Sequence, residues 1–165
     1  MNANDIINVN LNVKFMKIAF LTSGGIAPCL SSSIGALIQE YLKQTNYFTI
    51  IGYMHGYKGL LKGQSIPINK NIYDKSDILF KYGGSPLGNS RVKLSNKEDC
   101  VNQGYINAND NPFDIAAKQL IKDNVNILHT IGGDDTNSTA AELVDYLKSY
   151  GHKLTVVGLP KTVDN

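Results

Sequence analysis

Residues 127–136 have the sequence Ile-Leu-His-Thr-Ile-Gly-Gly-Asp-Asp-Thr, in which an apolar run ends in two glycines, two carboxylates and a hydroxyl. A similar succession occurs at residues 18–25, where Ile-Ala-Phe-Leu is followed by Thr-Ser-Gly-Gly. It returns at residues 154–162, where an apolar run leads to Gly-Leu-Pro-Lys-Thr. Each apolar run has the length and composition of a buried strand. If these strands are parallel, their carboxyl ends share one edge of the sheet, where α/β proteins bind ligands.

Segments with helical periodicity separate the strands. Apolar residues recur at helical spacing within 30–42, 113–121 and 140–147, and a further apolar run at 48–53 has the character of a strand. Because strands alternate with helices, the economical fold is α/β, a doubly wound and mainly parallel sheet with helices on both faces. Pro67 lacks a backbone N–H, so we expect the extended segment around it at a sheet edge.

Three local expectations concern the connections. Residues 54–61 are expected to form a loop and a turn, and the polar stretch 93–111 is expected to be irregular. The helix after the 127–131 strand is expected to begin at Thr136 or Asn137, whose side chains suit a helix start.

The composition is typical of one soluble globular domain. The chain has 165 residues, of which 42% are hydrophobic and 18% charged, and its net charge is +2. This balance argues against nucleic acid as a partner, and no apolar run has the roughly 18 residues of a membrane span. We therefore expect a protein without nucleic-acid or membrane partners, and its two separate cysteines, interpreted as reduced, favour the cytoplasm. Residues 1–14 are interpreted as a polar N-terminal extension and residues 15–165 as the domain.

The cysteines and histidines do not form a metal-binding pattern. Cys29 and Cys100 are far apart and no C-x-x-C occurs, so both are expected to be reduced thiols. His55 and His129 have no carboxylate at a spacing typical of a catalytic pair, and both are interpreted as structural rather than catalytic.

The first glycine pair, Gly24 and Gly25, would allow the backbone to approach a phosphate closely. The helix that follows would present free N–H groups and its positive end to an anion. A purely structural turn explains this pair about as well.

The second glycine pair precedes Asp134 and Asp135, either of which could supply a carboxylate to Mg²⁺. The alternative is an ordinary strand-to-helix turn with Asp135 or Thr136 as its N-cap. We favour a binding site, because two adjacent carboxylates repel each other unless a cation lies near them.

Two basic segments add to these turns. Arg91 follows a glycine-rich loop, and its planar guanidinium suits a phosphate, although an exposed surface arginine is equally compatible with the sequence. Lys161, Thr162 and Asp164 combine an ammonium, a hydroxyl and a carboxylate at a strand end. Asp164 could accept a proton from an attacking hydroxyl, and the alternative is a simple turn after Pro160.

Four of these segments occur in the order typical of the phosphofructokinases, a family that this sequence resembles over nearly its whole length after Lys14. The segments are 22–25 (TSGG), 83–91 (GGSPLGNSR), 132–136 (GGDDT) and 160–165 (PKTVDN). A related superfamily that includes the NAD kinases shares the Gly-Gly-Asp turn but not the last segment.

The resemblance implies roles for individual residues. Gly25 looks like the backbone donor to the transferred phosphate, Arg91 like the arginine that steadies it, and Asp134 like the Mg²⁺ ligand. Thr162 and Asp164 look like the residues that meet the sugar hydroxyl, with Asp164 as the general base. The implied phosphate-donor-binding residues are Gly24, Gly25, Arg91, Gly133, Asp135, Thr136 and Lys161, and the implied catalytic residues are Asp164, Lys161 and Arg91.

Positions 135 and 161 bear on the identity of the phosphate donor. ATP-dependent members of the family carry glycine at both positions. Pyrophosphate-dependent members resemble this chain, which has Asp135 and Lys161. A carboxylate at position 135 would crowd and repel an ATP α-phosphate, and an ammonium at position 161 adds positive charge for a short diphosphate. Ile26, where ATP-dependent members usually have an acidic residue, also favours pyrophosphate.

The resemblance therefore implies the N-terminal part of a pyrophosphate-dependent phosphofructokinase, incomplete at its C-terminus and without the second domain that supplies most fructose 6-phosphate contacts. The implied reaction of glycolysis is Mg²⁺-dependent phosphoryl transfer from pyrophosphate to the 1-hydroxyl of fructose 6-phosphate, which gives fructose 1,6-bisphosphate. We expect the 165-residue chain to be inactive alone and the full-length protein to be a homo-oligomer. An ATP-dependent phosphofructokinase and a non-catalytic phosphate-binding module are the alternatives.

Overall fold

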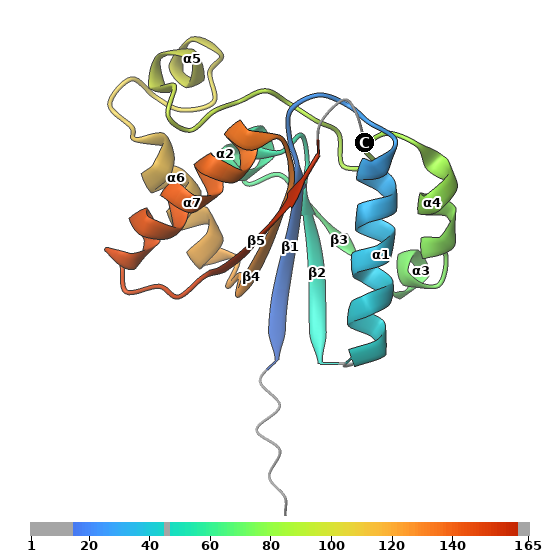
Figure 1. Cartoon of the computed structure of the whole chain (residues 1–165). Coiled ribbons are helices and arrows are strands. Elements are labelled where there is room, and N and C mark those ends of the chain that lie inside the picture. Colours follow the sequence, from blue (N-terminus) through green and yellow to red (C-terminus); the bar gives the residue numbers. More distant parts are fainter. Residues whose placement is uncertain (1–14, 45–46, 162–165) are drawn as a thin grey trace, which may run out of the picture.

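The computed structural model describes residues 15–44 and 47–161, which contain one five-stranded sheet with the order β3-β2-β1-β4-β5. The strands are β1 (Met16–Thr22), β2 (Phe48–Tyr53), β3 (Ser65–Ile68), β4 (Ile127–Gly132) and β5 (Thr155–Pro160). The central strand β1 pairs in parallel with β2 and β4, and β5 continues the parallel sheet beyond β4. Only β3 runs antiparallel among the described strands, at the edge beside β2, and it contains Pro67 (Figure 1). The mainly parallel sheet and the edge position of Pro67 are thus confirmed.

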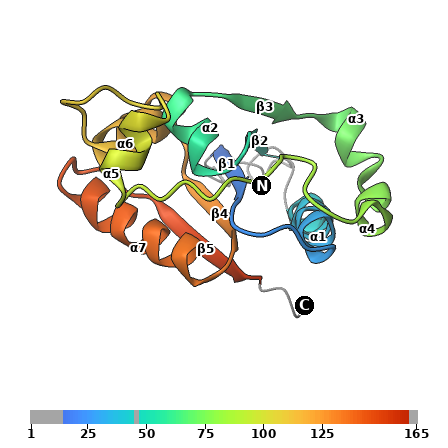
Figure 2. The ribbon, with the colours of Figure 1, turned by 90° about the horizontal axis from the view of Figure 1, so that it is seen from above.

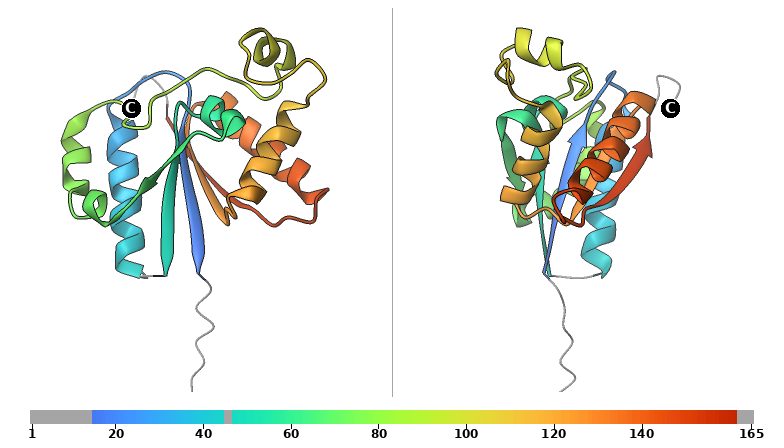
Figure 3. Two further views of the ribbon diagram at one scale, coloured as in Figure 1. Left: turned by 180° about the vertical axis from the view of Figure 1, so that it is seen from behind. Right: turned by 90° about the vertical axis from the view of Figure 1, so that its left-hand side faces the viewer.

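Helices cover both faces of the sheet, as the sequence predicted. The helices are α1 (Cys29–Gln44), α2 (Tyr57–Lys62), α3 (Lys70–Tyr73), α4 (Leu79–Tyr82), α5 (Lys97–Asn102), α6 (Pro112–Lys122) and α7 (Asp134–Lys148). Side chains alternate along β1, so that Ile18 and Phe20 belong to a core with α1, whereas Ala19 and Leu21 belong to a core with α2, α6 and α7. Figures 2 and 3 show α1 and α4 on one side of the sheet and α6 and α7 on the other.

The order of the strands creates a switch point between β1 and β4. From β1 the chain passes through α1 to β2 on one side, whereas β4 pairs with the other side of β1. The register pairs Thr22 with Ile131 and Gly132 with Pro160, so the segments that follow β1, β4 and β5 meet at one edge. This is the upper edge in Figure 1, and a switch point of this kind is where open α/β sheets bind ligands.

Three local expectations were wrong. A helix, α2, occupies part of the expected loop 54–61, and another, α5, interrupts the expected irregular stretch 93–111. Tertiary packing stabilises both short helices, because Leu60, Leu61 and Cys100 are buried in the core. The third helix, α7, begins at Asp134 rather than at Thr136 or Asn137, with Gly133 as its N-cap. An N-cap at Asp135 or Thr136 is thereby also excluded.

Cys29 and Cys100 are free thiols. Across residues 15–44 and 47–161, none of the helices is both long enough and apolar enough to cross a lipid bilayer.

Candidate phosphate-donor site

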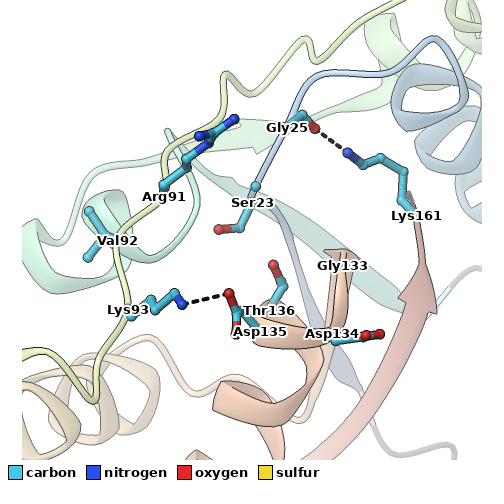
Figure 4. A pocket seen from close by; sticks show the side chains of 11 residues that line it. Ser23, Gly25, Arg91, Val92, Lys93, Gly133, Asp134, Asp135, Thr136 and Lys161 are labelled. Carbon is cyan, nitrogen blue, oxygen red and sulfur yellow. Dashed lines mark hydrogen bonds and ion pairs between the residues drawn. The ribbon is translucent and has the colours of Figure 1, made fainter. Parts of the chain in front are cut away.

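A cavity of about 670 Å³ lies at the carboxyl ends of β1 and β4 (Figure 4). Four segments form its lining: the turn after β1, the loop between α4 and α5, the first turn of α7, and the residue after β5. The lining residues are Ser23, Gly24, Gly25, Arg91, Val92, Lys93, Gly133, Asp134, Asp135, Thr136 and Lys161.

Most of the site residues chosen from the sequence meet in this cavity. Those that line it are Gly24, Gly25, Arg91, Gly133, Asp134, Asp135, Thr136 and Lys161. The other two, Thr162 and Asp164, lie outside the described residues. The structure therefore brings together residues from distant parts of the chain, and the roles assigned to them stay predictions.

The turn after β1 is held against the loop between α4 and α5. The backbone N–H of Gly24 donates to the carbonyl of Ser90 at 2.9 Å, and the Ser23 hydroxyl donates to the same carbonyl at 2.9 Å. Gly24 has a φ of +84°, a conformation that favours glycine. One reason for glycine here is thus conformational, independent of any ligand.

Gly132 and Gly133, at the end of β4, differ in how much space a side chain would have. A Cβ at Gly132 would lie 2.5 Å from Thr136 Oγ1 and 2.7 Å from the Ser23 carbonyl oxygen, so the close approach of two turns requires glycine there. A Cβ at Gly133 would meet nothing closer than the Lys161 carbonyl oxygen at 3.6 Å, an ordinary contact. Gly132 is therefore required by the packing of the two turns, whereas packing does not require a glycine at Gly133.

The positive end of α7 faces the cavity, because Asp134, Asp135 and Thr136 form its first turn and all line it. The sequence left the turn before α1 open to a phosphate-binding or a structural interpretation, and no residue of α1 lines the cavity among the described residues.

The two carboxylates of this turn point in different directions in Figure 4. Asp135 forms an ion pair with Lys93, with an Nζ–Oδ2 distance of 2.6 Å. The carboxylate of Asp134 has no hydrogen bond or ion pair within the described part of the chain. The repulsion between the two carboxylates is thus relieved in part by a lysine of the protein itself.

Lys93 was missed in the sequence. A signal was present, since Val92 and Leu94 are buried while Arg91 and Lys93 are exposed, an alternation that places both basic side chains on the same side of an extended segment. The guanidinium of Arg91 has no partner among residues 15–44 and 47–161, so its donors are available to an anion.

Lys161 crosses the cavity towards the first glycine turn. Its backbone N–H donates to the carbonyl of Gly132 at 2.8 Å, which continues the pairing of β4 and β5. Its ammonium donates to the carbonyl of Gly25, and only 3% of the residue is exposed (Figure 4). A buried ammonium whose partner is an uncharged carbonyl retains the capacity to bind an anion.

Tyr57 anchors the start of α7 from below. Its hydroxyl donates to the carbonyl of Thr136 at 2.7 Å, and the contact is buried. Burial, helped by the carboxylate of Glu142, raises the pKa of Tyr57 well above its ordinary value, so the hydroxyl stays a proton donor.

Asp134 is the lining residue that fits Mg²⁺. Within the described ranges, no three or more Asp, Glu, His or Cys side chains gather as a metal site. Mg²⁺ does not require such a cluster, because this ion is commonly held by one or two carboxylates, by substrate phosphates and by water. The unpaired carboxylate of Asp134 is suited to such a site.

Taken as a unit, the lining carries the side-chain charges of Arg91, Lys93 and Lys161 against those of Asp134 and Asp135. Such an arrangement suits a compact polyanion accompanied by a divalent cation. Among the described residues, His55 and His129 do not belong to the lining, and their structural interpretation stays a prediction.

Comparison with known proteins identifies the family of this chain. The model of the phosphofructokinase family matches residues 17–165. Pyrophosphate–fructose 6-phosphate 1-phosphotransferase of Propionibacterium freudenreichii subsp. shermanii is 55% identical over 149 residues, which cover 90% of this chain and 37% of that protein. ATP-dependent 6-phosphofructokinase of Entamoeba histolytica is 34% identical over 154 residues, which cover 93% of this chain and 31% of that protein.

A solved structure shows the same fold. Pyrophosphate-dependent phosphofructokinase from Marinobacter aquaeolei matches with a TM-score of 0.74 over 91% of this chain and 34% of that chain, at 23% identity. The chain spans about a third of the length of the curated relatives it matches. Because the family model matches nearly all of its residues, the chain belongs to the phosphofructokinase family.

Proposed function

We propose that the protein transfers a phosphoryl group from pyrophosphate to the 1-hydroxyl of fructose 6-phosphate, in the presence of Mg²⁺, to give fructose 1,6-bisphosphate. In this proposal the described residues form the phosphate-donor half of the site. The relative with 55% identity is named for this reaction, and its identity exceeds the 34% of the ATP-dependent relative.

The observation that carries the choice of donor is the position of Lys161 and Asp135 in one cavity. Lys161 places a buried ammonium beside Gly25, and Asp135 places a carboxylate, paired with Lys93, in the first turn of α7. Positive charge near Gly25 suits a diphosphate that has no nucleotide to hold it, whereas the carboxylate opposes the additional phosphate of ATP.

Phosphoryl transfer depends mainly on positioning and on electrostatic stabilisation of the phosphoryl oxygens. In the proposed arrangement, the backbone N–H of Gly25 and the guanidinium of Arg91 contact the transferred group, and Lys161 neutralises the diphosphate. Asp134 would hold Mg²⁺, whose positive charge would offset the negative charge of the diphosphate. Thr162 and Asp164 would meet the sugar hydroxyl, and Asp164 would accept its proton.

The proposal is tested by assaying the complete protein with fructose 6-phosphate and with each donor in turn, at saturating Mg²⁺. We expect turnover with pyrophosphate and little with ATP. Equal or better use of ATP would overturn the choice of donor, and no transfer from either would overturn the reaction itself.

For the isolated 165 residues we expect no turnover, because this chain spans only about a third of the relatives, which by resemblance use a second domain to bind the sugar phosphate. We further propose that the complete protein acts in the cytoplasm as a homo-oligomer.

A further inference from the structure

Asn89 lies in the loop between α4 and α5, behind the first glycine turn, and is not among the residues that line the cavity. Its side-chain Nδ2 donates to the carbonyl oxygens of Gly24 and Gly25, each at 3.2 Å. Backbone carbonyls only accept hydrogen bonds, so the amino group of the carboxamide must be the part that faces them. One side chain therefore holds two consecutive carbonyls.

Peptide geometry turns this contact into a constraint on the Gly25 N–H. The peptide between Gly24 and Gly25 is planar and trans, so its C=O and its N–H point in opposite directions. Because Asn89 holds the Gly24 carbonyl, the Gly25 N–H points away from Asn89. That N–H has no hydrogen-bond partner within the described residues, whereas the Gly24 N–H already donates to Ser90.

Two glycines in succession would leave this turn without side chains to fix its peptides. Lys161 also donates to the carbonyl of Gly25. Asn89 is the one side chain among the described residues that bonds to the carbonyl of Gly24. The direction of the Gly25 N–H therefore depends on Asn89 more than on any other described side chain.

The contact contributes more to orientation than to stability. Asn89 Oδ1 is buried and has no hydrogen-bond partner in the part of the chain that the structure describes. An unsatisfied buried acceptor costs free energy comparable to what the two Nδ2 hydrogen bonds contribute. Loss of the amino group should thus affect the turn more than the global free energy of unfolding.

We infer that Asn89 is a positioning residue, which directs the free N–H of Gly25 at the transferred phosphoryl group. The inference rests on the proposed function, because it requires a phosphoryl donor in the cavity. Asn89 itself does not touch the donor.

The test uses the complete protein with Asn89→Asp, which keeps the shape of the side chain but replaces the amino group with an oxygen that repels both carbonyls. We expect kcat/KM for pyrophosphate to fall by roughly 10- to 100-fold, because the misplaced N–H no longer meets the phosphoryl group. The KM for fructose 6-phosphate should stay within about twofold, since that substrate binds elsewhere.

Asn102→Asp is the matched control, because Asn102 is an exposed residue of α5 outside the cavity lining. It should leave both kinetic parameters and the melting temperature unchanged, whereas Asn89→Asp, which places a carboxylate against two carbonyls, should also lower the melting temperature. Asn89→Ser retains one hydroxyl donor and should give a smaller loss than Asn89→Asp. If Asn89→Asp fails to fold, Asn89→Ser carries the comparison.

Unchanged pyrophosphate kinetics in the Asn89 variants would overturn the inference, and so would a rise in the KM for fructose 6-phosphate as large as the fall in kcat/KM for pyrophosphate. Wild-type protein that prefers ATP would contradict the proposed donor alone. The Asn89 comparison would then be made with ATP, whose terminal phosphoryl group would meet the same N–H. Wild-type protein that transfers from neither donor would overturn both proposals.

Discussion

The ammonium of Lys93 lies 2.6 Å from the carboxylate of Asp135 and joins the loop between α4 and α5 to the first turn of α7. Both side chains are about half exposed or more, so the pair contributes on the order of 0–1 kcal/mol to stability. Its main consequence is geometric, because it gives the Asp135 carboxylate a defined direction in the cavity lining.

Asp135→Asn should weaken the preference for pyrophosphate over ATP. The substitution keeps the side-chain shape, removes the negative charge and leaves Lys93 free to meet phosphate. We expect the ratio of kcat/KM for the two donors to move towards ATP by roughly tenfold, as one removed charge near a phosphate implies. Steady-state kinetics of the complete protein with each donor measure this ratio.

Asp145→Asn provides the control for that substitution. Asp145 forms an ion pair of the same length, 2.6 Å, with Lys148 at the other end of α7. An equal change of donor preference in both variants would show that the effect is not local. An unchanged preference in Asp135→Asn would exclude Asp135 as a determinant.

Lys161→Met should lower kcat/KM for pyrophosphate by roughly 10²- to 10³-fold, because a buried positive charge beside Gly25 is lost. The protein should nevertheless remain stable. The ammonium is buried and its described partner is an uncharged carbonyl, which still accepts from Asn89 after the change. Lys148→Met, at the exposed end of α7, is the control.

Activity and thermal unfolding must be measured together for Lys161→Met. Loss of activity with an unchanged melting temperature would support a role in binding. A large fall of the melting temperature, with activity lost in proportion, would make Lys161 a structural residue.

The glycine pair after β4 gives a prediction about stability. Gly132→Ala would place its Cβ 2.7 Å from a backbone carbonyl of the neighbouring turn, which cannot move without displacing β1. We expect a loss of about 1–3 kcal/mol in the free energy of unfolding, as for other overpacked sites. Gly133→Ala has ordinary contacts only, and we expect it to cost less than about 1 kcal/mol as an N-cap substitution.

Denaturant unfolding of the two alanine variants compares these sites directly. Equal losses of unfolding free energy in the two variants would mean that the neighbouring turn adjusts to the Cβ at position 132. Close packing would then not explain the glycine there. If Gly133→Ala proves the more damaging, the cap of α7 matters more than the contact between the turns.

The long, apolar segments were the parts of the fold that the sequence predicted well. The strand expected at 48–53 coincides with β2, because a strand buried in the sheet is a continuous apolar run that needs no partner to be recognised. The helices α2 and α5 were missed because each has six residues, too few for periodicity. They depend on burial of single side chains, such as Tyr57 and Cys100, against distant elements.

In the site too, some features could be predicted from the sequence and others depend on tertiary contacts. Gly25 and Asp134 follow strands, so the geometry of a parallel sheet was enough to bring them together. Two contacts depend on how the loop between α4 and α5 crosses the sheet edge. One is the ion pair of Lys93 with Asp135, and the other is the hydrogen bonding of Asn89 to the glycine turn after β1. The alternation at 91–94 indicates which side of the segment Lys93 occupies, but no local pattern records the path of the loop, so its partners could be seen only in three dimensions.

The buried histidine His129 should make the stability of the protein depend on pH. The residue lies in β4 with 4% of its surface exposed, and its Nε2 is 2.8 Å from the hydroxyl of Tyr41. Its Nδ1 is buried without a partner among the described residues. Burial lowers the pKa of His129 to about 4, because the charged imidazolium is poorly solvated there.

The direction of the effect follows from proton binding. In the unfolded chain a histidine has a pKa of about 6.5, so between about pH 4 and 6.5 the unfolded state binds more protons than the folded state. The contribution of His129 is therefore fully present above about pH 6.5 and is lost as the pH falls towards 4, by roughly 3 kcal/mol at most. Urea unfolding at pH 7.5 and at pH 5 should show this loss.

Carboxylates also titrate in that window, so the test is a comparison of variants. His129→Gln removes the ionisable ring, and we expect its free energy of unfolding to fall less between the two pH values than that of the wild type. His152→Gln, at a half-buried histidine outside the cavity lining, should retain the wild-type dependence. If His129→Gln and the wild type lose the same free energy on acidification, the buried histidine does not govern acid stability, and the carboxylates must account for it.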